Sequence, residues 1–293
     1  MKPELRVVSQ QEQTKDFFNS YSNQWEASAN KKDGIIQQRN NFVLNTAREH
    51  FPAGVNCSLD IGCGTGELVA SLAEISKRAV GIDFAPSMIN KCEELKLRQN
   101  LDNVVFEVAD GLEFGAPDTY NIISANGFIE YISLAQLRDF AARAHELLKP
   151  NGVLCIGSRN RLFNLNTFNS FTSDEIKNGP NYLLMAEEAI ALSADTWEIQ
   201  NFAESISKVN YQDSKHMHPV TGVLVDQRFQ YTPLQLSNLI NHYNLKTVGL
   251  SGCNYHVLPL GSGVNDLVPP SSLRNTTIPF CSTFMIAFKK SAS

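Results

Sequence analysis

The sequence has no long apolar run and no block of basic residues. No stretch approaches the ~20 consecutive apolar residues that span a bilayer, and no charged-then-apolar segment resembles an export leader. The 25 lysines and arginines are interspersed among 30 acids, which gives a formal net charge of -5. A phosphate backbone attracts clustered positive charge, so nucleic acid is not expected as a partner. We expect a cytoplasmic protein that binds neither membrane nor nucleic acid.

The sequence also lacks the cysteine spacings that mark metal or disulfide sites. The six cysteines lie mostly in or beside apolar runs and form no Cys-x-x-Cys pair. They are Cys57, Cys63, Cys92, Cys155, Cys253 and Cys281. The pattern predicts reduced thiols, as a cytoplasmic compartment maintains them.

A glycine-rich turn is the most informative feature that is present. Residues 59–68 read Leu-Asp-Ile-Gly-Cys-Gly-Thr-Gly-Glu-Leu, an apolar strand that ends in an acid and turns into a helix. Gly62, Gly64 and Gly66 permit a sharp turn and close approach of a ligand to the backbone. The dinucleotide-binding pattern needs its third glycine at position 67, where Glu67 stands. Asp60 is expected either to hold the loop amides or to contact a cofactor.

Three further apolar runs also end in polar residues. Residues 79–82 precede Asp83, residues 104–109 precede Asp110, and residues 120–125 precede Asn126. In an arbitrary α/β protein such acids more often cap helices. Ligands of open parallel sheets, however, lie outside the carboxyl ends of the strands, so we expect these side chains to converge on one crevice.

The order of these motifs, completed by the helix end, turn and strand of residues 147–156, resembles class I S-adenosylmethionine-dependent methyltransferases. The resemblance implies an α/β, Rossmann-like fold with a seven-stranded, mostly parallel sheet, and S-adenosylmethionine as the cofactor. Asp83 would hold the ribose, Asp110 the adenine amino group, and Arg39 the methionine carboxylate. The implied cofactor-binding set is Tyr21, Arg39, Asp60, Gly62, Gly64, Gly66, Asp83, Phe84, Met88, Asp110, Gly111 and Asn126.

The remaining chain is predicted to form two attachments to this core. Residues 1–54 carry helical spacing over 10–26 and 33–50 and are expected to cover the cofactor crevice. Residues 55–158 form the cofactor-binding core, and residues 159–230 an inserted substrate cap with a helical segment at 182–194. Residues 231–293 complete the sheet with a helix over 233–243 and strands over 246–252 and 283–289. Thr232 and Pro233 mark the start of that helix.

Methyl transfer to a hydroxyl requires a base, for which histidine or a carboxylate is usual. His216 and His218 in the cap and His256 after the sixth strand are the catalytic candidates. The other three histidines lie in predicted helices, where we expect them at the surface. His216 and His218 also form a His-x-His pair, but only Asp213 stands nearby as a further ligand, and no metal is predicted.

Residues 126–131 narrow the class of acceptor. They read Asn-Gly-Phe-Ile-Glu-Tyr and lack the Asn/Asp-Pro-Pro-Tyr run of enzymes that methylate nucleobase or glutamine amines. Ile129-Glu130-Tyr131 instead resembles the Leu-Glu-His triplet of a small-molecule branch that includes quinone-biosynthetic enzymes.

Other strings, in residues 158–164, 229–233 and 255–256, faintly resemble methyltransferases of bacterial sugar modification. This resemblance assigns substrate contacts to Arg159, Arg161 and Tyr255, because guanidinium groups suit planar anions. Solvated or ion-paired arginines are the alternative.

These observations together predict methyl transfer to a small hydroxylated molecule, with O-methylation of a sugar or sugar conjugate as the leading hypothesis. N- or C-methylation of another metabolite, such as a quinone-like or aromatic acceptor, is the second. The third is a regulatory protein that binds the cofactor without transfer, which the intact glycines and acids disfavour. A homodimer stays open, because an apolar face on the N-terminal helices would suit either a lid or a subunit contact.

Overall fold

A computed structural model represents the chain. It describes residues 10–29, 31, 34–115, 117, 119–165, 170–177, 185, 186, 188, 189, 216, 217, 222, 224, 225, 230–255 and 278–291. Most of the predicted helix 182–194 lies outside these residues, and so do most of residues 210–218 and 261–279. The boundaries of the proposed inserted cap stay a prediction.

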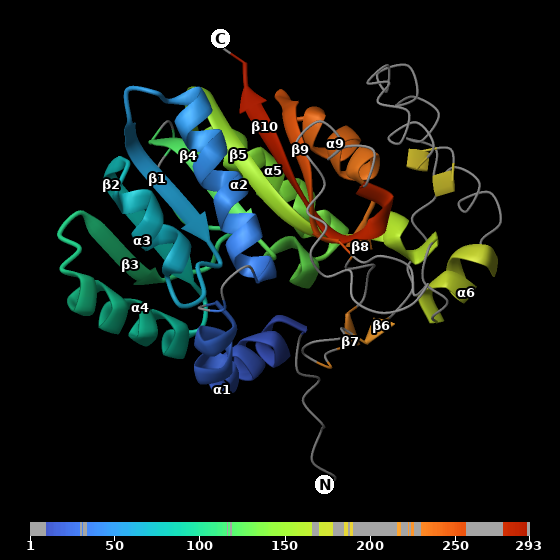
Figure 1. Cartoon of the computed structure of the whole chain (residues 1–293), viewed down its shortest axis with the longest axis horizontal. Helices are drawn as coiled ribbons and strands as arrows, with labels where there is room; N and C mark the ends of the chain where they lie inside the picture. The colour runs from blue at the N-terminus through green and yellow to red at the C-terminus, as the bar shows by residue number, and fades with distance from the viewer. Residues whose placement is uncertain are drawn as a thin grey trace, which may run out of the picture.

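One twisted sheet organises the described residues (Figure 1). Seven strands pair in the order β3 (Val104–Val108), β2 (Ser76–Asp83), β1 (Val55–Ile61), β4 (Tyr120–Asn126), β5 (Leu148–Asn160), β10 (Cys281–Lys290) and β9 (Leu245–Tyr255). Only β10 runs antiparallel to its neighbours in this path, and short β8 (Gln230–Tyr231) pairs in parallel beside β5. The predicted seven-stranded, mostly parallel sheet is therefore confirmed.

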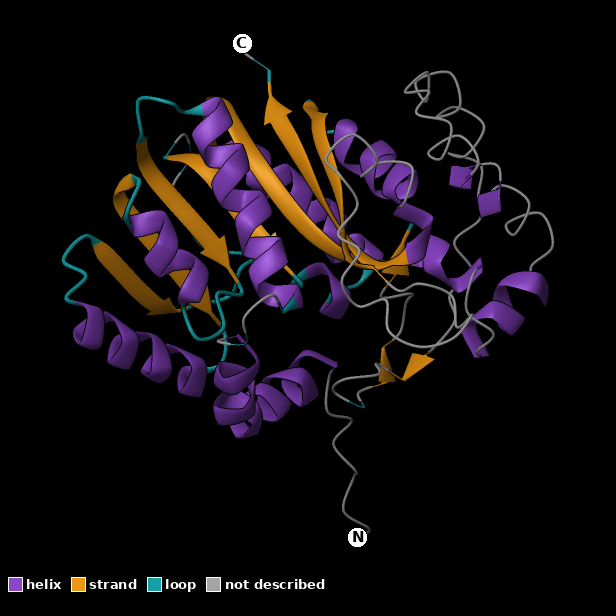
Figure 2. Ribbon diagram, viewed as in Figure 1, coloured by secondary structure: helices purple, strands orange, loops and turns teal. Residues whose placement is uncertain are grey.

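Helices cover both faces of the sheet, as Figure 2 shows. The apolar side chains of α2 (Ile35–His50), α3 (Glu67–Ala73) and α4 (Pro86–Gln99) share one buried cluster, whereas those of α5 (Leu134–Leu147) and α9 (Pro233–Asn241) share another. Central strands are buried on both faces, which explains their continuous apolar sequence. All six cysteines are free and buried in the structure.

Capping chemistry fixes where the late helix begins. The Thr232 hydroxyl accepts a hydrogen bond from the Gln235 amide at 3.1 Å, and the Gln235 side chain accepts one from the Thr232 amide at 3.2 Å. With Pro233 as the first helical residue, this reciprocal cap satisfies amides that the helix itself cannot pair. The helix start predicted at Thr232 and Pro233 is confirmed.

The N-terminal helix α1 (Gln10–Ala29) lies beside the carboxyl ends of the first strands (Figure 1). It packs against α4, where Asn19 Oδ1 accepts a hydrogen bond from the Ser87 amide at 3.3 Å and Glu26 pairs with Lys91 at 3.3 Å. Within the described residues, no helix combines the length and apolar character needed to cross a bilayer.

Two smaller helical segments follow β5: η2 (Arg161–Leu165) and α6 (Ser170–Lys177). Further along, β6 (His216–Met217) and β7 (Leu224–Val225) pair as a separate two-stranded sheet. Glu188 is buried and accepts a hydrogen bond from the Leu234 amide at 2.9 Å. A residue of the predicted cap thereby contacts the first turn of α9 in the core.

Candidate functional site

A cavity of about 480 Å³ lies at the carboxyl edge of the sheet. Its wall is formed by the ends of the parallel strands and by the start of β10, and α1 and α2 contribute the remaining side. The residues expected to converge on one crevice do so for the most part. Those that line the cavity are Tyr21, Arg39, Gly62, Gly64, Asp83, Phe84, Met88, Asp110, Gly111 and Asn126, together with Arg159.

The glycine turn presents backbone to the cavity. Gly64 adopts a φ of +54°, and a Cβ atom there would lie 2.7 Å from the indole nitrogen of Trp25. Both the left-handed backbone and this close approach require glycine. Gly66 does not line the cavity; it precedes α3 and packs toward Phe106 and Cys92.

Asp83 ties the second strand to the glycine turn. Its Oδ2 accepts a hydrogen bond from the Gly64 amide at 3.1 Å, and its Oδ1 accepts one from the Ala85 amide at 2.9 Å. Burial raises the pKa of Asp83 from 3.8 to about 6, against the opposing effect of these amide donors. The carboxylate therefore lies in a position where ligand hydroxyls would relieve its poor solvation.

Asp60 is buried and does not line the cavity. Burial raises its pKa to about 7, and the charges of Asp83 and Glu67 add to the rise, while the neighbouring Ser124 hydroxyl lowers it. Its contact with a cofactor and its support of the loop amides both stay predictions.

Asp110 lies at the end of the third strand and lines the cavity beside Gly111, Phe84 and Met88. Its Oδ1 accepts a hydrogen bond from the Leu112 amide at 2.9 Å. This end of the cavity thus joins a carboxylate to apolar side chains, a combination that suits a flat base with an exocyclic amine.

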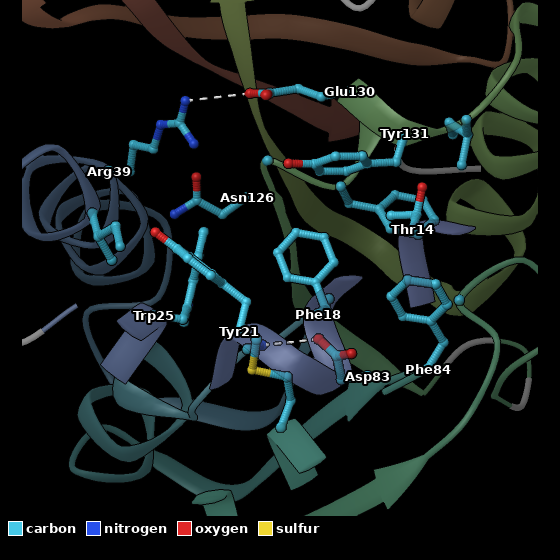
Figure 3. A pocket seen from close by; sticks show the side chains of 18 of the residues that line it. Thr14, Phe18, Tyr21, Trp25, Arg39, Asp83, Phe84, Asn126, Glu130 and Tyr131 are labelled. Carbon is cyan, nitrogen blue, oxygen red and sulfur yellow. Dashed lines mark hydrogen bonds and ion pairs between the residues drawn. The ribbon is translucent and has the colours of Figure 1, made fainter. Parts of the chain in front are cut away.

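A group of aromatic side chains also lines the cavity, as Figure 3 shows. The ring of Phe18 meets those of Trp25, Phe84 and Tyr131 edge to face, with centroid separations of 5.8, 6.5 and 5.3 Å. Tyr21 stacks on Phe17 at 4.9 Å and also lines the cavity. This packing is suited to excluding water from a bound ligand.

A carboxylate shared by two arginines lies further along the cavity. Glu130 Oε1 is 3.4 Å from Arg39 Nη2, and Glu130 Oε2 is 3.0 Å from Arg159 Nε. The Glu130 side chain is only 5% exposed. Sequence reasoning noted the Ile129-Glu130-Tyr131 triplet but assigned Glu130 no role, because the partners come from distant helix α2 and strand β5.

Polar residues beyond Arg159 were not predicted from the sequence. Asn254, Ser282 and Thr283 line the cavity, and Asn254 donates a hydrogen bond to the Ser282 hydroxyl at 2.7 Å. Thr283 pairs with Arg159 and with Cys253 in the antiparallel register of β10. The available signal was a Ser-Thr pair at the start of the last strand, but only strand pairing brings it to Arg159.

Arg161 does not lie at the cavity. It is 1% exposed and pairs with Glu175 through two hydrogen bonds of 2.7 and 2.6 Å. This bidentate geometry occupies the Nε and Nη2 atoms of Arg161, while its buried Nη1 has no partner in the described structure. In the described structure the alternative interpretation, an ion-paired arginine, therefore fits Arg161 better than a substrate contact.

The remaining candidates cannot be placed. The side chains of His216 and Tyr255, and all of His218 and His256, lie outside the described residues. No histidine of the described part lines the cavity, and no group of three or more histidine, cysteine or acidic side chains there is arranged for a metal ion.

Two buried polar atoms without partners indicate whether a nucleoside that carries an amino acid would fit the cavity. Arg39 Nε and Asn126 Oδ1 have no hydrogen-bond partner in the described structure, although both residues line the cavity. Buried polar groups normally have partners. A carboxylate suits the guanidinium and an ammonium suits the amide oxygen, so the donor set fits a zwitterionic ligand such as the methionine part of S-adenosylmethionine.

Comparison with known proteins agrees with this geometry. The ubiquinone biosynthesis O-methyltransferase of Schizosaccharomyces pombe is 28% identical over 154 residues, covering 50% of this chain and 54% of that protein. The erythromycin 3''-O-methyltransferase of Saccharopolyspora erythraea is 36% identical over 104 residues, covering 34% and 33%. The chain thus spans about half or less of the length of these curated relatives.

Similarity in structure extends further than similarity in sequence. The magnesium protoporphyrin IX methyltransferase of Synechocystis PCC 6803 superimposes with a TM-score of 0.58 at 10% identity, over 98% of this chain and 100% of that one. A family model described as a methyltransferase domain matches residues 57–216, more than half of the chain. The chain therefore belongs to the methyltransferase domain family and has the fold of class I S-adenosylmethionine-dependent methyltransferases.

Proposed function

We propose that the protein transfers the methyl group of S-adenosylmethionine to a hydroxyl group of a small molecule, and that this acceptor is a sugar or sugar conjugate. The observation that carries the proposal is one continuous cavity with two chemically different ends. The end at β1, β2 and β3 carries the glycine turn and two acids. The end at β5, β9 and β10 carries hydroxyl, amide and guanidinium groups.

The residues at the first end have the functional groups that the cofactor needs. Asp83 would accept hydrogen bonds from the ribose hydroxyls, Asp110 would receive the adenine amine, and Arg39 would hold the carboxylate. When bound, the sulfonium supplies an electrophilic methyl carbon. The protein then has to align the acceptor and exclude water, and no covalent nucleophile of its own is required.

The second end is suited to a polyhydroxylated acceptor. Ser282 and Thr283 can each donate and accept hydrogen bonds, and Asn254 adds an amide with both capacities. Arg159 would orient a carboxylate, a phosphate or a ring oxygen. The 36% identity to the erythromycin 3''-O-methyltransferase, over a short region, supports methylation of an oxygen.

A phenolic, quinone-like acceptor is the second candidate. The aromatic wall around Phe18 and Tyr131 would pack on a flat ring, and the ubiquinone biosynthesis O-methyltransferase matches a longer region of the chain. N- or C-methylation of such a metabolite remains the wider alternative. For a hydroxyl acceptor, one of the histidines His216, His218 and His256 is one possible source of the base, and a carboxylate of the cavity is the other.

The test has two stages. Isothermal titration with S-adenosylmethionine should give saturable binding, and the Gly64→Val variant should lose it because the added side chain meets Trp25. Formation of S-adenosylhomocysteine is then measured with sugar nucleotides and glycosides against catechols and hydroquinones. Turnover confined to the aromatic set would exclude the sugar, and binding without turnover of any acceptor would favour a regulatory protein.

A further inference from the structure

Glu130 lines the cavity and contacts one arginine proposed for the cofactor, Arg39, and one proposed for the acceptor, Arg159. Glu130 is the second residue of the short helix η1 (Ile129–Tyr131). Its carboxylate faces Arg39 from α2, as Figure 3 shows, and Arg159 from β5. The two arginines are 11% and 25% exposed, so both contacts are partly shielded from water. Both guanidinium groups stabilise the negative charge of this carboxylate.

The other ionisable groups of the cavity have different tasks. Asp83 and Asp110 accept hydrogen bonds from backbone amides at the nucleoside end. Tyr131 faces Glu130, Arg39 and Arg159, and burial together with the Glu130 charge raises the pKa of its phenol far above the usual range. Tyr131 therefore stays a hydrogen-bond donor, and among the described cavity residues Glu130 is the carboxylate placed beside the acceptor end.

Arg39 contacts Glu130 and is also proposed to bind the cofactor carboxylate. Its contact with Glu130, at 3.4 Å, is the longer of the two that Glu130 makes, and its buried Nε has no partner in the described residues. In the proposed function the cofactor carboxylate also needs Arg39. A carboxylate ligand that draws the guanidinium toward itself would leave Glu130 paired chiefly with Arg159.

We propose that Glu130 is the proton acceptor for the acceptor hydroxyl, and that Arg39 suppresses its basicity until the cofactor carboxylate draws Arg39 away. In this step the hydroxyl O–H bond breaks, the proton passes to a Glu130 carboxylate oxygen, and the electron pair stays on the acceptor oxygen. That oxygen then forms its bond to the methyl carbon as the carbon–sulfur bond breaks, its electron pair remaining on the sulfur. The inference rests on the proposed function and adds an order to it, since the base becomes competent only after the cofactor has bound.

Competition for Arg39 can be measured without knowing the acceptor. S-adenosylhomocysteine carries the amino-acid carboxylate, whereas 5′-methylthioadenosine has the same nucleoside without it. By isothermal titration, the Glu130→Gln variant should bind S-adenosylhomocysteine about two- to fivefold more tightly than the wild type, the scale of one ion pair. Binding of 5′-methylthioadenosine should be unchanged, which also shows that the variant is folded.

The Arg39→Gln background separates competition from simple charge removal. If Glu130 acts through Arg39, adding Glu130→Gln in that background should give no further tightening. Equal tightening in both backgrounds would overturn the competition, because it would reflect only the loss of a nearby negative charge. Weaker binding of S-adenosylhomocysteine to Glu130→Gln would overturn it as well.

The second measurement follows the Glu130 carboxyl directly. With ¹³C-labelled glutamate, the resonance that disappears in Glu130→Gln can be titrated with pH. Saturation with S-adenosylhomocysteine should raise the pKa of Glu130 by about one unit or more, as expected when one of two nearby cations withdraws, and 5′-methylthioadenosine should not. An equal response to both ligands would refute the base assignment. Failure of the wild type to bind S-adenosylhomocysteine would instead refute the proposed function.

Discussion

Replacement of Asp83 by asparagine should separate cofactor binding from stability. The carboxylate accepts amide hydrogen bonds at 3.1 and 2.9 Å, and burial raises its pKa from 3.8 to about 6. An asparagine oxygen can accept only one of those amides, and leaving the other unpaired costs about 1–3 kcal/mol. Removing the buried charge relieves about 3 kcal/mol at neutral pH. The two effects nearly cancel, so the ligand-free variant should have close to wild-type stability at pH 8.

Affinity should respond differently, because asparagine cannot accept hydrogen bonds from both ribose hydroxyls. Binding of S-adenosylhomocysteine at pH 8, measured by isothermal titration, should weaken by about 1–3 kcal/mol. Unfolding in urea at the same pH supplies the stability control. Unchanged affinity in a stable variant would remove Asp83 from the nucleoside site, and a large loss of stability would show that its principal task is to hold the Gly64 turn.

In the wild type, affinity for S-adenosylhomocysteine should depend on pH through the ionisation of Asp83. Asp83 must be ionised to accept two hydroxyl donors, and its pKa without ligand is raised to about 6. Binding of S-adenosylhomocysteine should therefore weaken as pH falls from 8 to 5, with the change centred near 6. In the Asp83→Asn variant this dependence should disappear, and its persistence would assign the titration to another group.

Three further comparisons of variants test separate parts of the structure. Gly64→Ala should abolish nucleoside binding. The control is Gly222→Ala, at a φ of +65° with no described atom within 4 Å of the added Cβ, which should only strain the backbone. Equal binding in titrations of both variants would contradict the close approach at Gly64. Glu175→Ala should destabilise the chain by about 3–5 kcal/mol in urea unfolding, because Arg161 loses its buried partner, yet leave S-adenosylhomocysteine affinity unchanged. Burial raises the pKa of Glu188 from 4.5 to about 7, so this group costs stability as pH rises from about 4 to 7. Glu188→Gln should raise the free energy of unfolding at pH 8 by up to about 3 kcal/mol and have no such effect at pH 4.

The nucleoside half of the site was predictable because its residues follow strand ends. A short apolar run that ends in Asp83 or Asp110 reports both a strand and the edge at which that strand stops. Parallel pairing of neighbouring strands then brings those side chains together without further information. The helix start at Thr232 was equally readable, since a cap is a local pattern.

The acceptor half depends on contacts that no local pattern contains. Thr283 meets Arg159 only because β10 enters the sheet antiparallel to β5. Glu130 meets Arg39 across 91 residues of chain. Arg159 belongs to β5 and Arg161, two positions later, begins η2. Arg161 is buried against Glu175, whereas Arg159 lines the cavity. Spacing in the sequence could identify arginines near the end of β5 but not the partner of each.

The indole of Trp25 above Gly64 gives the protein an optical reporter. Any nucleoside that settles on the turn must displace or touch this ring, so its emission should change in intensity or wavelength. The sequence holds one other tryptophan, Trp197, which lies outside the described residues. A Trp197→Phe protein would leave a single fluorophore, and ligand arrival and departure could then be timed by stopped flow without attaching a dye.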